Sequence, residues 1–240
     1  MGRLAVVGGH TILDLALDDV LGMPSRERRI PGPGGPVTVV DAGSVVFLQR
    51  HRQPDYVPAN RLDHHAHAAA LVAAGCDRVL AIGSAGGLTP SLPVGTTLVP
   101  DDFIAFSAQP DSRFADERAL SVPGFARDWR ARVLAAWTAH APTAPVDGGV
   151  YWQARGPRFE TPAEVRMIAA FADVVGMTVG SECVACAERG LAYAAVCVVD
   201  NLANGLGDAG LTVEEFEAGT AANVATLVAT LREVVPELAR

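Results

Sequence analysis

Polar residues follow the apolar runs of this 240-residue sequence at six places, and their types could bind an anion and a small molecule. The six places hold His10, Arg50 and His51, Ser84, Arg158 to Glu160, Met177 and Thr178, and Asp200 and Asn201. Arginine offers a planar fork of N–H donors to anionic oxygens, and an acid at the mouth of a buried strand can act as a general acid. Taken one at a time, these residues have other interpretations. Arg50 and His51 could be a solvated strand end, and Asp200 could cap the turn that follows it. Their repeated position after apolar runs is what indicates a site.

Two glycine-rich turns could bring the backbone close to a ligand. VVGGH (6–10) puts Gly9 before His10, and GSAGGL (83–88) puts Ala85 and Gly86 after Ser84. Exposed backbone amides in such turns can bind an anion, although the same glycines also suit a tight connection between a strand and a helix. Neither turn is a Walker loop, because no Gly-Lys-Ser/Thr follows.

The hydrophobic pattern predicts strands that alternate with helices. Strands are expected at 3–9, 78–88, 95–106, 149–154, 172–177 and 191–201, a hairpin at 37–51, and helices at 61–74, 125–140, 162–171, 180–189 and about 212–235. This alternation predicts a single α/β domain over residues 1–240, with a mostly parallel central sheet and helices on both faces. Loops are expected at 22–36 and 106–124. Ligands of such sheets bind beyond the carboxyl ends of the strands, where the polar residues fall.

The stretch QARGPRFETPAE (153–164) contains a helix start and further residues that the helix start leaves unexplained. Thr161 suits the N-cap, Pro162 the first helical position, and Glu164 the third residue of a capping box. Phe159 and Glu160 precede the cap and are candidates for ligand binding.

Composition excludes several classes of protein. The 27 acidic residues outnumber the 19 basic ones, all of them arginine, which gives a net charge of −8, so a broad nucleic-acid surface is not expected. We find neither a signal peptide nor an apolar run long enough to cross a membrane, and expect a cytoplasmic protein. Cys183 and Cys186 form an isolated CxxC, read as buried thiols. DHHAH (63–67) has metal-ligand spacing without a partner motif, so a helix start or a subunit contact is favoured over a metal.

Taken together, these motifs resemble the trimeric purine nucleoside phosphorylase and methylthioadenosine phosphorylase family. The resemblance covers most of the chain in order and is carried by VVGGH, RH (50–51) with PANRLDHHAHAAAL, GSAGGL, VPDDFI, GPRFETPAE, and ADVVGMTVGSECVACAERGLAYAAVCVV. GPRFETPAE is the most specific of these segments. The resemblance implies an α/β fold with a mixed sheet, a homotrimer that could pair into a dimer of trimers, and reversible phosphorolysis of a purine nucleoside. Phosphate is then a co-substrate, and no metal or organic cofactor is needed.

The resemblance also implies roles for individual residues. The phosphate site would comprise Gly9, His10, Arg50, His51, Ser84 and Thr178. The base and ribose would contact Ala85, Gly86, Phe159, Glu160, Met177, Asp200, Asn201 and Val213. Asp200 is the expected catalytic group, because a protonated carboxyl could donate to N7 as charge develops on the leaving purine. His10 and Gly83 depart from the family pattern, so water could replace phosphate as the nucleophile.

The sequence points in two directions on the purine. In the family, Asp at the Asp200 position is typical of methylthioadenosine enzymes, whereas Glu at the Glu160 position is typical of 6-oxopurine enzymes. Asn201 could supply an amide to a 6-oxo base if the strand end is shifted by one residue. Val213 stands near the place of a histidine that binds the 5′-hydroxyl, so it would suit a methylthio group, unless it is a core valine at a helix start.

Asp200 and Val213 together favour 5′-methylthioadenosine or a related 5′-modified nucleoside as the substrate. The alternatives are a general 6-oxopurine nucleoside phosphorylase, a hydrolytic nucleosidase, and a purine-binding protein without activity.

Overall fold

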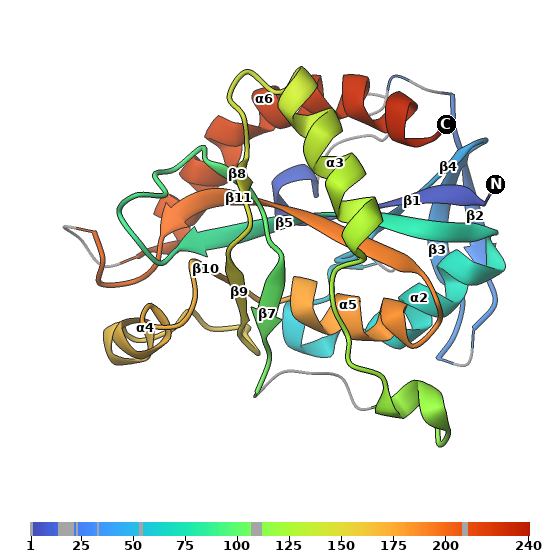
Figure 1. The fold of residues 1–240 in the computed structure, drawn as a ribbon, viewed down its shortest axis with the longest axis horizontal. Coiled ribbons are helices and arrows are strands. Elements are labelled where there is room, and N and C mark those ends of the chain that lie inside the picture. Colours follow the sequence, from blue (N-terminus) through green and yellow to red (C-terminus); the bar gives the residue numbers. More distant parts are fainter. Residues whose placement is uncertain are drawn as a thin grey trace.

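A computed structural model describes residues 2–13, 22, 24–32, 34–52, 55–106, 112–207 and 211–240. Eleven strands of this part of the chain form one mixed sheet (Figure 1). Its centre is the long strand β5 (Cys76–Gly87), which pairs in parallel with β1 (Arg3–Gly8) and with β11 (Ala192–Leu202). The fold therefore has the mixed, mostly helix-covered sheet that the sequence predicts.

The remaining strands extend the sheet on both sides of this centre. They are β2 (Arg26–Ile30), β3 (Val37–Ala42), β4 (Val45–Gln49), β6 (Thr97–Val99), β7 (Asp102–Ile104), β8 (Val146–Asp147), β9 (Val150–Gln153) and β10 (Val174–Gly176). The main order is β2-β3-β4-β1-β5-β10-β9-β7, and β11 pairs with β5 and β6 outside this path. The hairpin expected at 37–51 is β3 and β4, which pair antiparallel.

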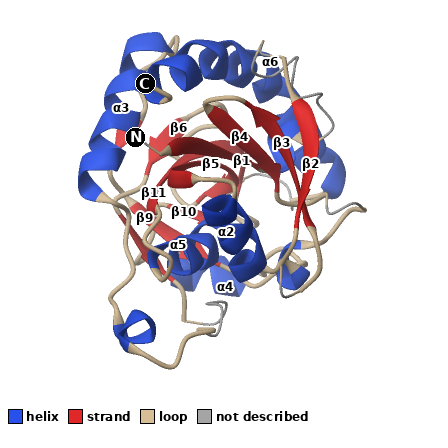
Figure 2. Cartoon of the chain, turned by 90° about the vertical axis from the view of Figure 1, so that its right-hand side faces the viewer, coloured by secondary structure: helices blue, strands red, loops and turns tan. Residues whose placement is uncertain are grey.

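Helices cover both faces of the sheet (Figure 2). The helices α3 (Arg127–His140) and α6 (Val213–Leu238) lie on one face, α2 (His64–Ala73) and α5 (Val179–Ala187) lie on the other, and α4 (Pro162–Ile168) lies near β9 and β10 (Figure 1). Short 3₁₀ helices occur at η1 (His10–Ile12), η2 (Ala59–Arg61) and η3 (Glu117–Leu120). Covered on both sides, β1, β5 and β11 are apolar along nearly their whole length.

The sequence-based boundaries need three corrections. The single strand expected at 95–106 is two short strands, β6 and β7, on opposite sides of Pro100, which cannot donate to a sheet ladder. Part of the loop expected at 22–36 is the edge strand β2. The helix expected at 61–74 begins only at His64.

The helix start at Thr161 is confirmed. The Thr161 hydroxyl accepts from the Glu164 amide at 3.2 Å, and the Glu164 carboxylate accepts from the Thr161 amide at 2.7 Å, which is a complete capping box. Within the described residues, no helix is both long and apolar enough to span a bilayer.

Candidate active site

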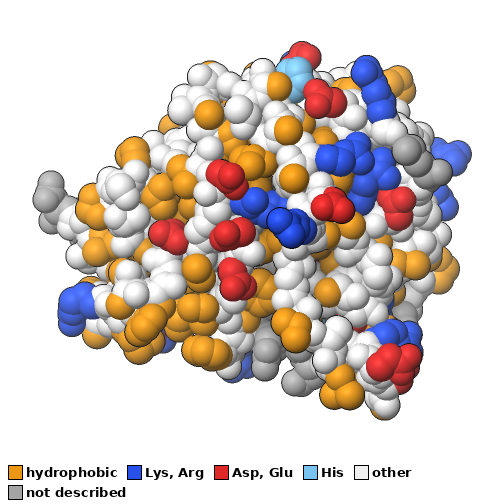
Figure 3. Space-filling model, viewed as in Figure 1, with side chains coloured by type: hydrophobic (Ala, Val, Ile, Leu, Met, Phe, Trp, Pro, Cys, Tyr) orange, Lys and Arg blue, Asp and Glu red, His pale blue; other side chains and the backbone are white. Residues whose placement is uncertain are grey.

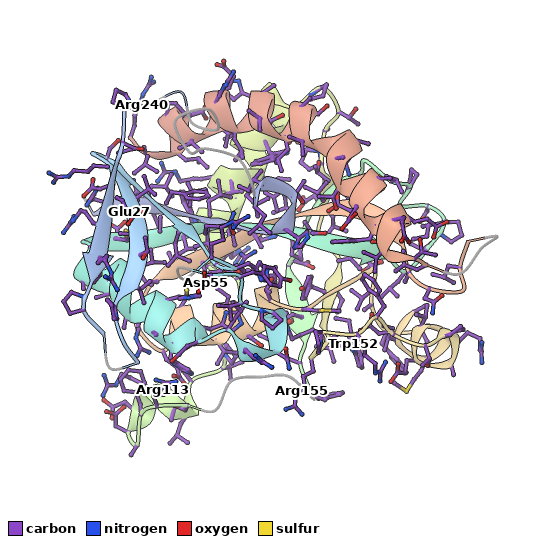
Figure 4. The ribbon with its side chains drawn as sticks, turned by 180° about the vertical axis from the view of Figure 1, so that it is seen from behind. Glu27, Asp55, Arg113, Trp152, Arg155 and Arg240 are labelled. Carbon is purple, nitrogen blue, oxygen red and sulfur yellow. The ribbon has the colours of Figure 1, made fainter. Side chains whose placement is uncertain are left out.

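One pocket lies at the carboxyl ends of the central strands, and most of the candidate residues line it. Its empty volume is about 890 Å³, including the part open to solvent. In Figure 4, which shows the molecule from behind, the segment carrying Asp55 lies over the middle of the molecule, and Trp152 lies toward α4. The lining residues are His10, Arg50, His51, Tyr56, Ala59, Ser84, Ala85, Gly86, Pro157, Phe159, Glu160, Val175, Gly176, Met177, Thr178, Asn201, Ala203, Asn204, Leu211 and Phe216.

Two histidines and a tyrosine form one end of the pocket. The rings of His51 and Tyr56 stack with centroids 5.8 Å apart, and His10 meets each of them edge-on at 6.1 and 6.2 Å. His51 Nδ1 lies 2.9 Å from the carbonyl oxygen of Val57, which can only accept, so this nitrogen carries the ring proton. Burial and then the Arg50 charge lower the pKa of His51 to about 4. His51 is therefore neutral near pH 7, with Nε2 as an acceptor.

Arg50 lines the pocket but is already paired. Its Nε and Nη2 donate to the two carboxylate oxygens of Glu182, each at 3.0 Å, and Nη1 donates to the carbonyl of Ile82 at 2.8 Å. Tyr193 donates to the same carboxylate at 2.8 Å. Arg50 is 1% and Glu182 3% exposed, so this is a buried ion pair and not a solvated strand end. Burial opposes the ionised carboxylate, yet Arg50 holds the pKa of Glu182 below its usual value.

The middle of the pocket is formed by the ends of β5 and β10. Ser84, Ala85 and Gly86 come from β5, and Met177 and Thr178 follow β10 at the start of α5. The Thr178 amide donates to the hydroxyl of Tyr151 at 3.2 Å, which fixes the first turn of α5 on the neighbouring strand β9. These five residues stand where the sequence predicts a ligand.

The other end of the pocket combines aromatic, carboxylate and amide side chains. Phe159 and Phe216 are in contact, with ring centroids 5.7 Å apart. Asn204 holds this end together, because its Nδ2 donates to the carbonyl of Glu160 at 3.0 Å and its Oδ1 accepts from the Leu211 amide at 3.2 Å. Burial raises the pKa of the Glu160 carboxyl.

Asn201 lines the pocket, whereas Asp200 does not. Neighbouring strand residues point to opposite faces, and the pairing of β11 with β5 shifts between Val199 and Asn201. The Asp200 carboxylate instead accepts from the Thr11 hydroxyl at 3.1 Å and from Asn223 Nδ2 at 2.7 Å. Asp200 is 1% exposed, and burial raises its pKa against the effect of its hydrogen bonds. Asp200 thus lies behind the pocket wall, and its contact with a ligand stays a prediction.

Two further candidates do not line the pocket. A Cβ atom on Gly9 would lie 2.6 Å from the carbonyl oxygen of Ile82 and 2.9 Å from Arg50 Nη1, so this glycine is needed for close packing behind the pocket wall. Val213 is the first residue of α6 and is 57% exposed. Leu211 and Phe216 are apolar residues near it that do line the pocket, and a role for Val213 stays a prediction.

Sequence reasoning missed several lining residues. The most informative of them are Tyr56, Asn204, Leu211 and Phe216. Phe216 lies one turn after Val213 on α6, so a helical projection from that candidate would have reached it. Tyr56 and Asn204 lie in connecting segments that carry no periodic signal.

The isolated cysteine and histidine motifs have structural positions. Cys183 and Cys186 are free and buried. His64, His65 and His67 are buried in the first turn of α2, where Asp63 caps the helix by accepting from the Ala66 amide at 2.9 Å. Among the residues that the structure describes, no group of three or more potential ligands is placed to hold a metal ion.

Comparisons with known proteins agree with this architecture. A probable 6-oxopurine nucleoside phosphorylase of Archaeoglobus fulgidus is 34% identical over 241 residues, which cover 98% of this chain and 96% of that protein. A probable S-methyl-5′-thioinosine phosphorylase of Xanthomonas campestris pv. campestris is 34% identical over 246 residues, with 99% and 97% covered. A structure of methylthioadenosine phosphorylase from Schistosoma mansoni with adenine shares the fold at a TM-score of 0.83 and 21% identity, covering 99% of this chain and 92% of that chain. The family model described as "Phosphorylase superfamily" matches residues 10–236, and the chain belongs to that superfamily.

Proposed function

We propose that this protein catalyses phosphorolysis of a 6-oxopurine nucleoside with an apolar 5′ group, of the S-methyl-5′-thioinosine type. The observation that carries the choice of base is the side chain at the end of β11: Asn201 lines the pocket and Asp200 does not. The argument for a 6-aminopurine depended on a carboxylate lining the pocket at the end of β11. Because the amide of Asn201 lines the pocket there, that argument loses its support. The proposal that the protein cleaves a purine nucleoside with phosphate holds for either base.

The hydrogen-bonding groups at the base end favour a 6-oxo base. Such a base presents an N1–H donor and the acceptors O6 and N7. An ionised Glu160 can accept from N1–H, and the Asn201 amide can donate to O6 or N7. A 6-amino base has a lone pair at N1, which an ionised Glu160 would repel. Glu160 and Asn201 therefore both favour a 6-oxopurine. The Phe159 ring offers a face on which the base can stack.

An apolar group at the 5′ position is supported by the apolar side chains that lie between the base end and His10. Leu211 and Phe216 line the pocket there, and the Phe216 ring lies 5.1 Å from that of His10. A methylthio group would bury its surface against these side chains, and a hydroxyl there would leave part of its hydrogen-bonding capacity unused. Two relatives with substantial identity carry names for 6-oxopurine and S-methyl-5′-thioinosine phosphorylases, which agrees with both parts of the proposal.

In the proposed reaction, a phosphate oxygen bonds to C1′ as the bond from C1′ to N9 breaks. Positive charge grows on the sugar, and the anion beside it stabilises that charge. The electron pair of the broken bond moves into the purine, where the Asn201 amide would stabilise it by donating to N7. His10 and Thr178 are the proposed donors to phosphate, whereas His51 Nε2 and the Ser84 hydroxyl oxygen can accept from a protonated phosphate oxygen. Met177 would lie under the ribose. Phosphate is the co-substrate, and this scheme uses no cofactor.

We also propose that the protein assembles as a homotrimer, alone or as a pair of trimers. Exposed apolar side chains support an assembly: Phe106 is 86%, Phe171 64% and Met167 56% exposed. Figure 3 shows apolar side chains gathered at the end of the molecule that carries α4. Light scattering at several concentrations will measure the mass, and a monomer at all of them would contradict the proposal.

Release of base from four nucleosides tests the activity. S-methyl-5′-thioinosine, 5′-methylthioadenosine, inosine and adenosine are each incubated with enzyme, with and without phosphate. The proposal predicts phosphate-dependent cleavage that is fastest for S-methyl-5′-thioinosine. Equal rates without phosphate would indicate a nucleosidase, and binding without turnover would indicate a purine-binding protein. Cleavage of the adenine nucleosides alone would overturn the proposed base.

A further inference from the structure

We infer that Asp200 is a positioning residue that fixes two walls of the pocket at once, the η1 turn that carries His10 and the start of α6 that carries Phe216. This inference rests on the proposed function for its kinetic consequences but has a structural readout of its own. It gives a buried carboxylate behind the pocket wall a positioning task, whereas the resemblance implied a catalytic one.

Donors from three separate segments converge on this carboxylate. Thr11 from η1 donates at 3.1 Å, Asn223 from α6 donates at 2.7 Å, and the Ser84 hydroxyl at the end of β5 also hydrogen-bonds to it. An ionised carboxylate has two oxygens and accepts from several donors, whereas an amide at the same point offers one oxygen. Because Asp200 is 1% exposed, water does not replace these bonds easily.

Each donor either lines the pocket or lies on the same short segment or helix face as a residue that does. Thr11 directly follows His10, and Ser84 lines the pocket itself. On α6, Asn223 lies seven residues after Phe216, which is two helical turns along the same face. Movement of the carboxylate would therefore shift the phosphate end and the 5′ end of the pocket together.

The backbone at Asp200 reinforces the attachment of α6. A Cβ atom on Gly219 would overlap the carbonyl oxygen of Asp200, so α6 crosses the strand end at a distance that only glycine permits. Asn223 Nδ2 also lies 3.2 Å from the carbonyl of Val199. Turning the Asn223 amide around to suit a changed partner at position 200 would lose that second contact.

The base end of the pocket is held by other hydrogen bonds and meets α6 through the ring contact of Phe159 with Phe216. Glu160 is held through its carbonyl by Asn204, and the Asn201 amide donates to the carbonyl of Leu202 at 2.8 Å. Two adjacent residues at the end of β11 would thus have different functions. Asn201 would hydrogen-bond to the base, and Asp200 would hold the phosphate and 5′ walls of the pocket in place.

The test uses Asp200→Asn in the full chain, with Asp147→Asn as the matched control. Asp147 is an exposed acid that pairs with Arg130 at 2.6 Å, and neither residue lines the pocket. In D200N we expect the KM for phosphate to rise about tenfold and the preference for 5′-methylthio over 5′-hydroxyl to fall about tenfold, the scale of one lost charge-assisted hydrogen bond. The ratio of inosine to adenosine cleavage should stay within about twofold of the wild type.

Amide hydrogen exchange measures the positioning without turnover. In D200N, exchange should accelerate in residues 9–13 and 212–224 together, and should change much less in 157–165, which meets α6 only through the contact of Phe159 with Phe216 among the ring contacts of the described residues. If D200N fails to fold, the pair Thr11→Val and Asn223→Ala removes the two donors singly, and each variant should loosen its own segment. Unchanged exchange in both segments would overturn the inference. So would a fall in kcat at constant KM with loss of an acid limb from the kcat profile, since that marks a catalytic acid. A wild type inactive on every nucleoside would contradict the proposed function and leave the exchange test intact.

Discussion

The buried pair of Arg50 and Glu182 gives a prediction about stability that can be worked through from the structure. Replacing Glu182 by Gln keeps the shape of the side chain and removes its charge, so the Arg50 guanidinium remains buried without a counterion. Breaking one side of a buried ion pair costs about 3–5 kcal/mol. In a domain of this size, 1 kcal/mol lowers Tm by about 2–4 °C, so Tm should fall by roughly 6–20 °C.

The control is a second glutamate–arginine ion pair, which lies at the surface in contact with solvent. Glu164 receives two hydrogen bonds from Arg158, both at 2.8 Å, but its side chain is 40% exposed. Glu164→Gln preserves the capping-box geometry, and solvent screens the lost charge, so Tm should change little. Differential scanning calorimetry of both variants at pH 7 measures the difference. If E182Q loses no more stability than E164Q, burial is not what makes this pair important, and the reasoning is wrong.

Two further predictions concern pH. Burial raises the pKa of Glu160, so its ionised form is lost at a higher pH than for an ordinary glutamate; the KM for a 6-oxopurine nucleoside should rise as the pH falls through that pKa, and Glu160→Gln should flatten the profile. Burial also lowers the pKa of His64 to about 3 and of His67 to about 4. Because the unfolded chain binds these protons near pH 6.5, stability is complete above that pH and falls on acidification, by about 2 kcal/mol per histidine at pH 5. Calorimetry at pH 7 and 5 should show this loss, and His67→Asn should reduce it; a Tm independent of pH in this range would contradict it.

The sequence was most informative where the physics is local. Thr161, Pro162 and Glu164 form the capping box because all its contacts lie within one turn. The apolar runs at β5 and β11 predict a buried sheet, and its topology then brings His51, Ser84 and Thr178 to one pocket. These inferences need only periodicity and the rule for strand ends.

Sequence reasoning left alternatives open where a one-residue difference or a distant contact decides which side chain lines the pocket. The pairing shift before Asn201 reverses which of two adjacent side chains faces the pocket, and periodicity cannot detect such a shift. The resemblance placed Asp200 at the purine, and its hydrogen bonds to Thr11 and Asn223 were not foreseeable because both donors are far away in the chain. Tyr56 stacks on the nearby His51, a contact that no periodic pattern of the sequence indicates.

The relative kcat/KM for S-methyl-5′-thioinosine and 5′-methylthioadenosine, measured with saturating phosphate in the wild type and in Asn201→Asp, tests the central claim most directly. An amide that donates to a 6-oxo base becomes a carboxylate that repels it, and a mismatched buried polar group costs about 1–3 kcal/mol. The wild type should therefore prefer the thioinosine, and N201D should shift the ratio toward the thioadenosine by about 10- to 100-fold. A wild type that prefers the thioadenosine, or a ratio that N201D leaves unchanged, would contradict the account.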